Sequence, residues 1–261
     1  MSPKYIFIVP YRNRELEKIH FSIYMEYILE NYNKSNYEIY YSEQLDNNIP
    51  FNRGATKNIG FLMAKNKYPD NYKDIIFIFN DIDSLPFKQD QLNYYTSKGT
   101  IKHFYGTKTT LGGIFSITGS DFELIKGFAN LWGWGIEDNV LNNRAITNKI
   151  IIDRSHFYSI NDRNILNINS GYHKIMSVKE TNNYFTNKLD NIDNIYNLEY
   201  SIENNNITTK YNNQYIIKIK RFNTNTDPIN LKYYQKNTNI SSIIKPFNRN
   251  YNSYKMNFKN Y

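Results

Sequence analysis

The first eighty residues alternate short apolar runs with segments in which apolar residues recur every three or four positions. Residues 5–9 form a β-branched and aromatic run between two prolines, which is typical of a buried strand. A helix is predicted over residues 14–31. Its apolar face is formed by Leu16, Ile19, Ile23 and Tyr27.

The same pattern repeats twice more. Residues 37–41 and 74–79 are predicted strands, and the second is nearly continuous in apolar residues, as a central parallel strand is. Between them, residues 54–66 form a predicted helix with Ile59 and Leu62 on its apolar side. Strand, helix, strand, helix, strand at this spacing predicts an α/β fold with a parallel sheet and right-handed crossovers.

The later part of the chain changes character. Glycines concentrate between residues 106 and 135, which indicates tight turns or backbone close to a ligand. Residues 198–203 and 211–220 predict a hairpin around an asparagine-rich turn. From residue 222 the chain is polar and basic, so we divide it into a domain over residues 1–221 and a basic C-terminal appendage over residues 222–261.

Composition narrows the classes of protein. The chain has 261 residues, no cysteine, 40% hydrophobic residues and a net charge of +8. Disulfides, thiolate zinc sites and cysteine nucleophiles are excluded. No apolar run approaches the roughly 20 residues of a membrane span, and no secretory leader is recognisable, so we predict a cytoplasmic protein. Asparagine, isoleucine, lysine and tyrosine share AT-rich codons, which favours a low-GC microbe or a large DNA virus, whose proteins act in the host cytoplasm.

Polar clusters follow two of the predicted strands, where parallel sheets bind ligands. Arg12 and Arg14 follow the first strand, and Asp81 and Asp83 follow the third. On an extended backbone the two carboxylates point to opposite sides, so one can bind a hard divalent cation and the other a ribose hydroxyl. A helix cap or a turn is the alternative interpretation of such acids.

Arginines can also bind phosphates through their planar guanidinium groups. Arg12, Arg14 and Arg53 are candidates for this contact, and Phe51 or Tyr11 can stack on a base. Surface ion pairs and core aromatic residues are the alternative.

Both tryptophans of the chain lie in residues 132–138, where they alternate with glycine and precede Glu137 and Asp138. Indole faces pack on sugar rings, and carboxylates bond sugar hydroxyls or accept their protons. Acids also favour a helix N-terminus, but capping does not explain two tryptophans in a glycine frame.

Five segments in this order resemble the beta-1,4-galactosyltransferase family, and the resemblance covers roughly residues 4 to 221. The segments are residues 9–14 (VPYRNR), 51–55 (FNRGA), 81–83 (DID), 112–113 (GG) and 132–138 (WGWGIED). The resemblance implies a GT-A fold, with a Rossmann-like mixed sheet and flanking helices. It also implies transfer from a UDP-sugar with inversion at the anomeric carbon, usually with manganese.

The resemblance assigns roles to individual residues. It makes Asp83 the metal-binding acid, Asp138 the general base, and Trp134 the tryptophan of a mobile loop that closes over donor and acceptor. The implied donor-binding residues are Pro10, Tyr11, Arg12, Arg14, Phe51, Arg53, Asp81, Ile82, Asp83, Lys102, Thr110, Gly113 and Trp134. The implied acceptor-binding residues are Trp134, Gly135, Glu137, Asp138, Asn139 and Tyr172.

The chain departs from the family in three places. The family's other metal ligands are a methionine and a histidine spaced M-x-x-H. Counting back from Lys179 places His156 at the first of these and Ser159 at the second, so we predict His156 as a manganese ligand, with a structural His156 as the alternative. Asn139 replaces an acid. Thr110 replaces a tyrosine and leaves room beside the sugar's C2 substituent.

We therefore predict a metal-dependent, inverting glycosyltransferase that moves a hexose or N-acetylhexosamine from a UDP-sugar to a hydroxyl of a glycan or glycoconjugate. One alternative is a non-catalytic glycan-binding relative of the same fold. Another is a nucleic-acid-binding protein, suggested by the net charge of +8. Because the basic residues are scattered, we expect no nucleic-acid partner, and we expect no membrane segment.

Overall fold

Strand β1 (Tyr5–Tyr11) lies in the middle of a nine-stranded sheet, and all seven of its residues are buried. It pairs in parallel with β2 (Tyr37–Gln44) on one side and with β3 (Ile76–Asn80) on the other. This pairing confirms the predicted parallel strands. The computed structural model describes residues 2–168, 174–177, 190–207, 213–228 and 244–247.

The helices that connect these strands are close to their predicted bounds. The α-helices are α1 (Glu15–Ile28), α2 (Arg53–Lys67), α3 (Gly119–Leu124) and α4 (Glu137–Thr147), and short 3-10 helices span Lys34–Asn36 and Ile192–Asn194. The other strands are β4 (Ser84–Pro86), β5 (Thr100–Gly106), β6 (Ile114–Thr118), β7 (Ile151–Asp153), β8 (Tyr158–Ser159), β9 (Ile165–Asn167), β10 (Lys174–Ser177), β11 (Tyr196–Asn204), β12 (Gln214–Asn223) and β13 (Ile244–Phe247).

The sheet is mixed. Its strand order is β11-β12-β2-β1-β3-β6-β5-β7, and β8 also pairs with β5. The strands from β12 to β3 are parallel, whereas β6 is antiparallel to both of its neighbours. The predicted hairpin is formed by β11 and β12, and β12 adds to the sheet beside β2.

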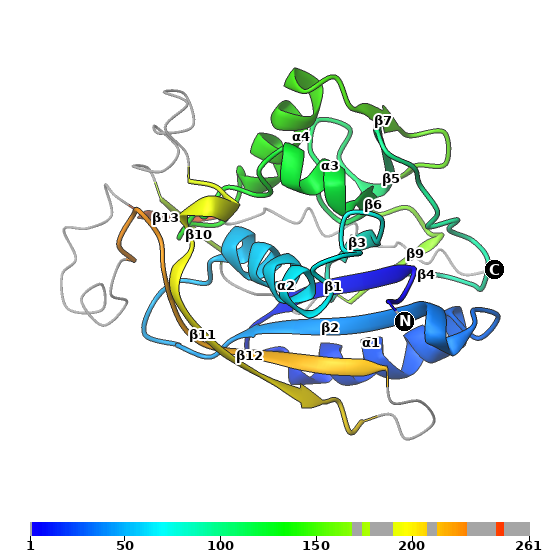
Figure 1. The fold of residues 1–261 in the computed structure, drawn as a ribbon, viewed down its shortest axis with the longest axis horizontal. Coiled ribbons are helices and arrows are strands. Elements are labelled where there is room, and N and C mark those ends of the chain that lie inside the picture. Colours follow the sequence, from blue (N-terminus) through cyan, green and yellow to red (C-terminus); the bar gives the residue numbers. More distant parts are fainter. Residues whose placement is uncertain (1, 169–173, 178–189, 208–212, 229–243, 248–261) are drawn as a thin grey trace, which may run out of the picture.

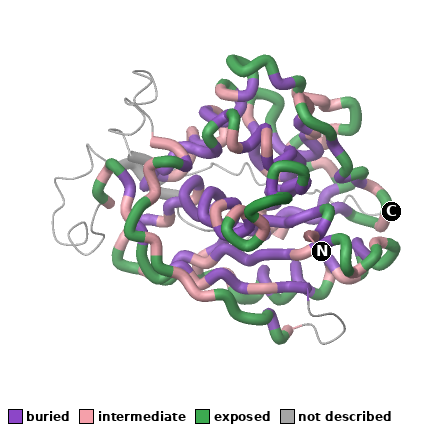
Figure 2. Tube along the Cα trace, viewed as in Figure 1, coloured by how far each residue is buried: buried purple, intermediate pink, exposed green. Residues whose placement is uncertain are grey.

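Helices cover both faces of the sheet (Figure 1). Because side chains alternate along a strand, β1 sends Ile6 and Ile8 into a core with α2, α3 and α4, and sends Phe7 and Val9 into a second core with α1. The strands between the two layers are buried, whereas exposed residues lie mainly at the periphery (Figure 2). This arrangement gives the three layers of an α/β fold.

Helix α1 faces the sheet with a different side from the one that its apolar residues predict. Leu16 is 79% exposed, and Ile19, Ile23 and Tyr27 are exposed as well. The buried side instead carries Phe21, Met25 and Ile28 together with polar residues.

The reason lies in the tyrosines of the sheet beneath α1. The Ser22 hydroxyl donates to the Tyr41 hydroxyl over 3.0 Å, and Lys18 Nζ donates to the Tyr11 hydroxyl over 3.3 Å. Because a buried hydroxyl needs a hydrogen-bond partner, this face of the sheet selects polar residues of α1.

Helix α2 begins where its sequence provides a cap. The Asn52 side chain accepts a hydrogen bond from the backbone N–H of Ala55 over 2.9 Å, and two lysines lie in the last turn. This cap fixes Arg53 as the first residue of the helix, at the edge of the sheet where β1 and β3 end.

The expected boundary at residues 221 and 222 falls inside β12, which continues to Asn223. Thr224 and Thr226 then accept hydrogen bonds from the Trp132 indole, so the described residues up to 226 pack with the domain. Division of the chain beyond residue 228 stays a prediction. Within the described ranges, no helix is long and apolar enough to cross a membrane.

Candidate functional site

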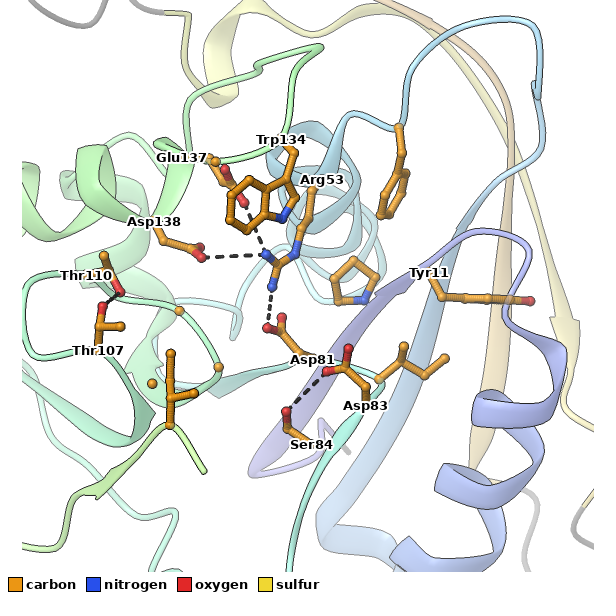
Figure 3. Close-up of a pocket in the computed structure, with 18 of the residues that line it drawn as sticks. Tyr11, Arg53, Asp81, Asp83, Ser84, Thr107, Thr110, Trp134, Glu137 and Asp138 are labelled. Atoms are coloured by element: carbon orange, nitrogen blue, oxygen red, sulfur yellow. Dashed lines mark hydrogen bonds and ion pairs between the residues drawn. The ribbon is translucent and has the colours of Figure 1, made fainter. Parts of the chain in front are cut away.

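A cavity of about 810 Å³ opens at the edge of the sheet where β1 and β3 end. The N-terminal residues of α2 and α4 also line it, so two helix N-termini, which favour anions, border the same space (Figure 3). This is the place that the polar clusters after the first and third strands predict.

The structure brings together most of the residues predicted to bind donor or acceptor. Those that line the cavity are Pro10, Tyr11, Arg12, Arg14, Phe51, Arg53, Asp81, Ile82, Asp83, Thr110, Gly113, Trp134, Gly135, Glu137, Asp138 and Asn139. Tyr172, predicted as an acceptor contact, lies outside the described residues. Further lining residues that the sequence did not single out include Tyr105, Thr107, Ile160 and Asn167.

Two predicted residues are not among those that line the cavity. Lys102 lies on β5, opposite Asp153 of β7, rather than at the end of a strand. His156 is exposed in the turn between β7 and β8. His156 is therefore not among the residues that line the cavity beside Asp83. The count from Lys179 allowed no gap, and β9 brings Asn167 to the cavity instead.

Asp81 and Asp83 lie in a tight turn after β3. The backbone N–H of Asp81 donates to Gly113 over 3.0 Å, and the N–H of Ser84 donates back to the Asp81 carbonyl over 3.1 Å. Both carboxylates line the same cavity, whereas an extended backbone would have sent them to opposite sides. The turn that we weighed as the alternative interpretation is therefore compatible with a site.

The Asp83 carboxylate is partly exposed and is held by two groups. Arg14 Nη1 lies 2.7 Å from its Oδ2, and the Ser84 hydroxyl donates to its Oδ1 over 3.2 Å. Across the β4–β9 pairing, Oδ1 of Asn167 accepts hydrogen bonds from the hydroxyls of Ser84 and Tyr105. Oxygen atoms therefore surround this end of the cavity.

Those oxygen atoms suit a hard cation. No group of three or more His, Cys, Asp or Glu side chains that could hold a metal ion occurs among the described residues. Asp83, Ser84 and Asn167 nevertheless supply carboxylate, hydroxyl and amide oxygens, which are the ligands that Mn²⁺ and Mg²⁺ prefer. The Asp83 carboxylate already forms an ion pair with the Arg14 guanidinium, so it lies where a positive charge can be bound. The residues present fit a divalent cation centred on Asp83.

Arg53 lies between the two acidic clusters of the cavity (Figure 3). Its guanidinium forms an ion pair with Asp81, and Nη1 lies 3.4 Å from Oε1 of Glu137 and 3.8 Å from Oδ2 of Asp138. Burial alone would raise the pKa of Asp81, but the charges of Arg53 and Lys57 lower it. Asp81 is therefore kept as an anion in a buried site.

Lys57 is a second buried cation, which the sequence analysis missed. It lies one turn after Arg53 on α2, its side chain is 1% exposed, and its Nζ donates to Oδ1 of Asp138 over 3.0 Å. The sequence does contain a signal for the burial of Lys57, which is its spacing. Lys57 lies four residues from both Arg53 and the buried Phe61, so it belongs to the inner face of the helix.

Glu137 and Asp138 begin α4, and they lie in different environments. Glu137 is buried, and this burial, together with the neighbouring Asp138 charge, raises the pKa of Glu137 to about 7. Ile136, which precedes them, has φ 73°, a left-handed conformation that is unusual for a β-branched residue. Local strain of this kind is found at functional sites, where surrounding structure holds it in place.

The two tryptophans have different tasks. Trp132 borders the cavity but is 1% exposed, and its indole stacks on Phe222 of β12, so it is packed against the protein rather than presented to a sugar. Trp134 lines the cavity over Arg53 and Glu137 (Figure 3). Trp134 is thus the indole placed to pack on a ring bound in the cavity.

The aromatic residues near β1 also divide. Tyr11 is 1% exposed and packs edge-on against Tyr41, so it is not available to stack on a base. Phe51 is half-buried at the rim, with the Arg12 guanidinium 5.3 Å from its ring centre. Arg12 donates to the Ile49 carbonyl over 2.7 Å, so it fixes the loop that carries Phe51 rather than presenting its fork to phosphates.

The segment around Thr110 is held by a network of hydrogen bonds. The Thr110 hydroxyl bonds that of Thr107 over 2.8 Å, and Arg154 donates to the Thr110 carbonyl over 3.2 Å and to Nδ1 of His103 over 3.0 Å. The other ring nitrogen of His103 bonds the Gly112 carbonyl over 2.9 Å, and burial lowers the pKa of His103 to about 4. The neutral His103 ring therefore supports this wall of the cavity.

Gly112 shows how closely this wall approaches α4. A Cβ atom at Gly112 would lie 2.3 Å from Oδ2 of Asp138, so any larger residue here would displace that carboxylate. The backbone N–H of Leu111 donates to the Asp138 carbonyl over 3.0 Å. Asp138 is therefore fixed by its main chain and by the ions around it.

Comparisons with known proteins agree with this geometry. The model of the N-terminal region of glycosyl transferase group 7 matches residues 2–98, and the model of the N-terminal domain of galactosyltransferase matches residues 96–174. Among curated proteins, xylosylprotein 4-beta-galactosyltransferase of Caenorhabditis elegans is 32% identical over 156 residues, which are 56% of this chain and 52% of that protein. Mouse beta-1,4-galactosyltransferase 1 is 31% identical over 162 residues, 58% of this chain and 39% of the relative. The chain thus matches about half of these relatives' length, or less.

Two solved structures share the fold. The catalytic domain of Drosophila beta-1,4-galactosyltransferase 7 in complex with xylobiose aligns with a TM-score of 0.63 at 24% identity, over 87% of this chain and 96% of that one. A mutant of the same enzyme in complex with manganese, UDP-Gal and xylobiose gives the same TM-score at 23% identity. The predicted fold class, an α/β GT-A fold, is confirmed.

Proposed function

Because the chain belongs to glycosyl transferase group 7, we propose that it is a metal-dependent inverting glycosyltransferase that uses a UDP-sugar. The acceptor is a hydroxyl of a glycan or glycoconjugate. One observation carries the proposal: a single cavity holds Asp83 at one end and Asp138 at the other, with Arg53 between them (Figure 3). Donor phosphates and an acceptor hydroxyl need these two kinds of group at a short separation.

The donor end would bind the nucleotide diphosphate. Asp83, with oxygens of Ser84 and Asn167 nearby, would hold a divalent cation, which would supply positive charge to the leaving diphosphate. Arg14 and Arg53 add guanidinium groups that bond phosphate oxygens. Phe51 at the rim is the aromatic face available to the base.

The acceptor end would carry out the proton transfer. Asp138 accepts the proton of the acceptor hydroxyl while that oxygen forms a bond to the anomeric carbon. The bond from that carbon to the diphosphate breaks, and its electron pair stays on the phosphate oxygen. Attack from the side opposite the leaving group inverts the carbon. Trp134 covers the sugars and excludes water, which would otherwise compete as the acceptor.

The test is a screen of UDP-sugars with and without manganese, first for hydrolysis and then for transfer to sugar acceptors. We expect wild-type protein to release UDP only with a divalent cation, and Asp138→Asn to bind UDP but to transfer roughly 10²–10⁴ times more slowly. Asp193→Asn, which removes an exposed partner of Lys126, is the matched control and should behave as wild type.

Two results would contradict the proposal. UDP binding without turnover of any UDP-sugar would indicate a non-catalytic glycan-binding relative. Full turnover by Asp138→Asn would show that another group is the base. The cytoplasmic location stays a prediction.

A further inference from the structure

Lys57 is a buried charge in a place where a helix normally buries an apolar residue. Its side chain is 1% exposed on the inner face of α2, and its Nζ lies 4.4 Å from the centre of the Phe128 ring. Burying an ammonium group is costly unless anions and hydrogen bonds compensate for the lost water. The contacts of Lys57 should therefore show what it is for.

Its anionic contacts are residues of the cavity. Nζ donates to Oδ1 of Asp138 over 3.0 Å and lies 3.9 Å from Oδ1 of Asp81. That Asp81 oxygen is buried and has no hydrogen-bond partner among the described residues, so Lys57 and Arg53 supply its compensating charge. The lysine thus links the base end of the cavity to the donor end.

The contact also distinguishes the two oxygens of Asp138. Oδ1 is engaged by Lys57, whereas Oδ2 lies beside Gly112, with Nη1 of Arg53 3.8 Å away. A carboxylate that is free to rotate would present either oxygen at variable angles. With one oxygen held by a buried ammonium group, the other keeps a single direction.

We propose that Lys57 is a positioning residue for sugar transfer: it holds Oδ1 of Asp138, so that Oδ2 is the oxygen that receives the acceptor proton. This inference rests on the proposed function. It assigns no contact between Lys57 and either substrate. Misplacing a catalytic group by about 1 Å can cost roughly 100-fold in rate, so the effect should be measurable.

Other charged or titratable groups face the same pair. They are Arg53 from α2, Asp81 after β3, Glu137 from α4 and His103 from β5. The charge of Lys57 lowers the pKa of Glu137, so removing that charge raises it and favours proton uptake by Glu137 at higher pH. A pH profile therefore separates a positioning residue in this cluster from a lysine that only supports the fold.

The experiment compares Lys57→Met with Lys65→Met. Lys65 is on the same helix and its ion pair with Glu123 is half exposed, so it is a matched control outside the cavity. We expect Lys57→Met to lower kcat roughly 10–100-fold, to change the KM for the donor less than about threefold, and to move the acid limb of the kcat/KM profile to higher pH. Lys65→Met should leave all three unchanged. A kcat and an acid limb equal to wild type in Lys57→Met would overturn the proposal.

A second variant covers the case in which Lys57→Met does not fold. Lys57→Arg keeps the charge but replaces a compact ammonium group by a planar fork. We expect it to fold, to keep the acid limb, and to lose at least about fivefold in kcat. Wild-type kcat in this variant would overturn the proposal.

A double-mutant cycle separates failure of this inference from failure of the proposed function, because it needs no turnover. We expect Lys57→Met and Asp138→Asn each to lower Tm. The double variant should lose much less in Tm than the sum of the two single losses. Coupled losses in a protein that transfers no sugar would leave the contact in place and reject the proposed function. Additive losses would reject the contact, and with it the inference.

Discussion

Trp132 stacks on Phe222, with the two ring centroids 5.2 Å apart and the planes inclined by 10°. The Trp132 indole N–H also donates to the Thr226 carbonyl over 2.7 Å. Strand β12 and the residues that follow it therefore fix the start of the segment that carries Trp134. Trp132 is thus an anchor that borders the cavity, and Trp134 is the more exposed of the two tryptophans that line it.

Removing the anchor should weaken both stability and catalysis. Phe222→Ala is expected to lower the free energy of unfolding by about 3 kcal/mol, since it deletes a buried ring. Phe87→Ala, which truncates an exposed phenylalanine, should change it by less than about 0.5 kcal/mol. Urea unfolding of the two variants measures the difference. Equal values would show that the stacked pair carries no stability.

We expect Asn167, which lines the cavity, rather than His156 to be a metal ligand beside Asp83. Asp83→Asn should abolish the manganese dependence of UDP binding, and Asn167→Ala should weaken manganese binding roughly 10–100-fold. His156→Ala should titrate like wild type, because the structure leaves this residue exposed and away from the cavity. Calorimetric titration of manganese in the presence of UDP checks the three variants. A weakened His156→Ala would restore the ligand that the sequence suggested.

Stability should depend on pH through Glu137. Burial, together with the Asp138 charge, raises the pKa of Glu137 from an ordinary 4.5 to about 7. Its proton therefore stabilises the folded state fully below about pH 4.5, and this contribution is lost as the pH rises through 7. The loss at pH 8 is on the order of 3 kcal/mol.

Glu137→Gln keeps the shape and cannot ionise. Its Tm relative to wild type should rise between pH 5 and pH 8, whereas Glu199→Gln, on an exposed part of β11, should follow wild type throughout. A constant difference between Glu137→Gln and wild type across this range would mean that Glu137 is already ionised at pH 5.

Donor choice should depend on Thr110. Its small side chain lines the cavity and bonds that of Thr107, and Arg154 holds its backbone carbonyl, so the space that a larger residue would fill stays open. We expect UDP-GalNAc or UDP-GlcNAc to be used at least comparably to UDP-galactose, and Thr110→Tyr to shift the ratio of kcat/KM values towards galactose by about 1–3 kcal/mol. Strict use of UDP-galactose by wild type, unchanged in Thr110→Tyr, would exclude this role.

The sequence predicted the parallel strands and most of the cavity because both have local signals. A continuous apolar run identifies β3, and the polar residues directly after it, such as Asp81, lie where parallel strands end. The order of the motifs also predicted the cavity residues from Trp134 to Asn139.

The predictions that failed concerned features that depend on contacts between residues distant in the sequence. The face of α1 was misassigned because its preference is set by Tyr41 of the sheet, which bonds Ser22. Lys57 was missed because a lysine in a helix is normally exposed, and only the arrival of Asp138 from α4 makes its burial favourable. His156 is not among the residues that line the cavity, because the count along the chain that selected it cannot allow for the turns before β9.

Strand β12 has a consequence for how the protein is made. It completes the parallel part of the sheet beside β2, and Tyr41 bonds Gln214 across 173 positions of sequence. At about 5–20 residues per second, a ribosome needs on the order of 10–40 s to deliver β12 after β2 has emerged. During that interval one edge of β2 has no partner from its own sheet, and an open edge can pair with another nascent chain. A lower level of expression should therefore give more soluble protein, because fewer nascent chains with an open β2 edge are present at the same time.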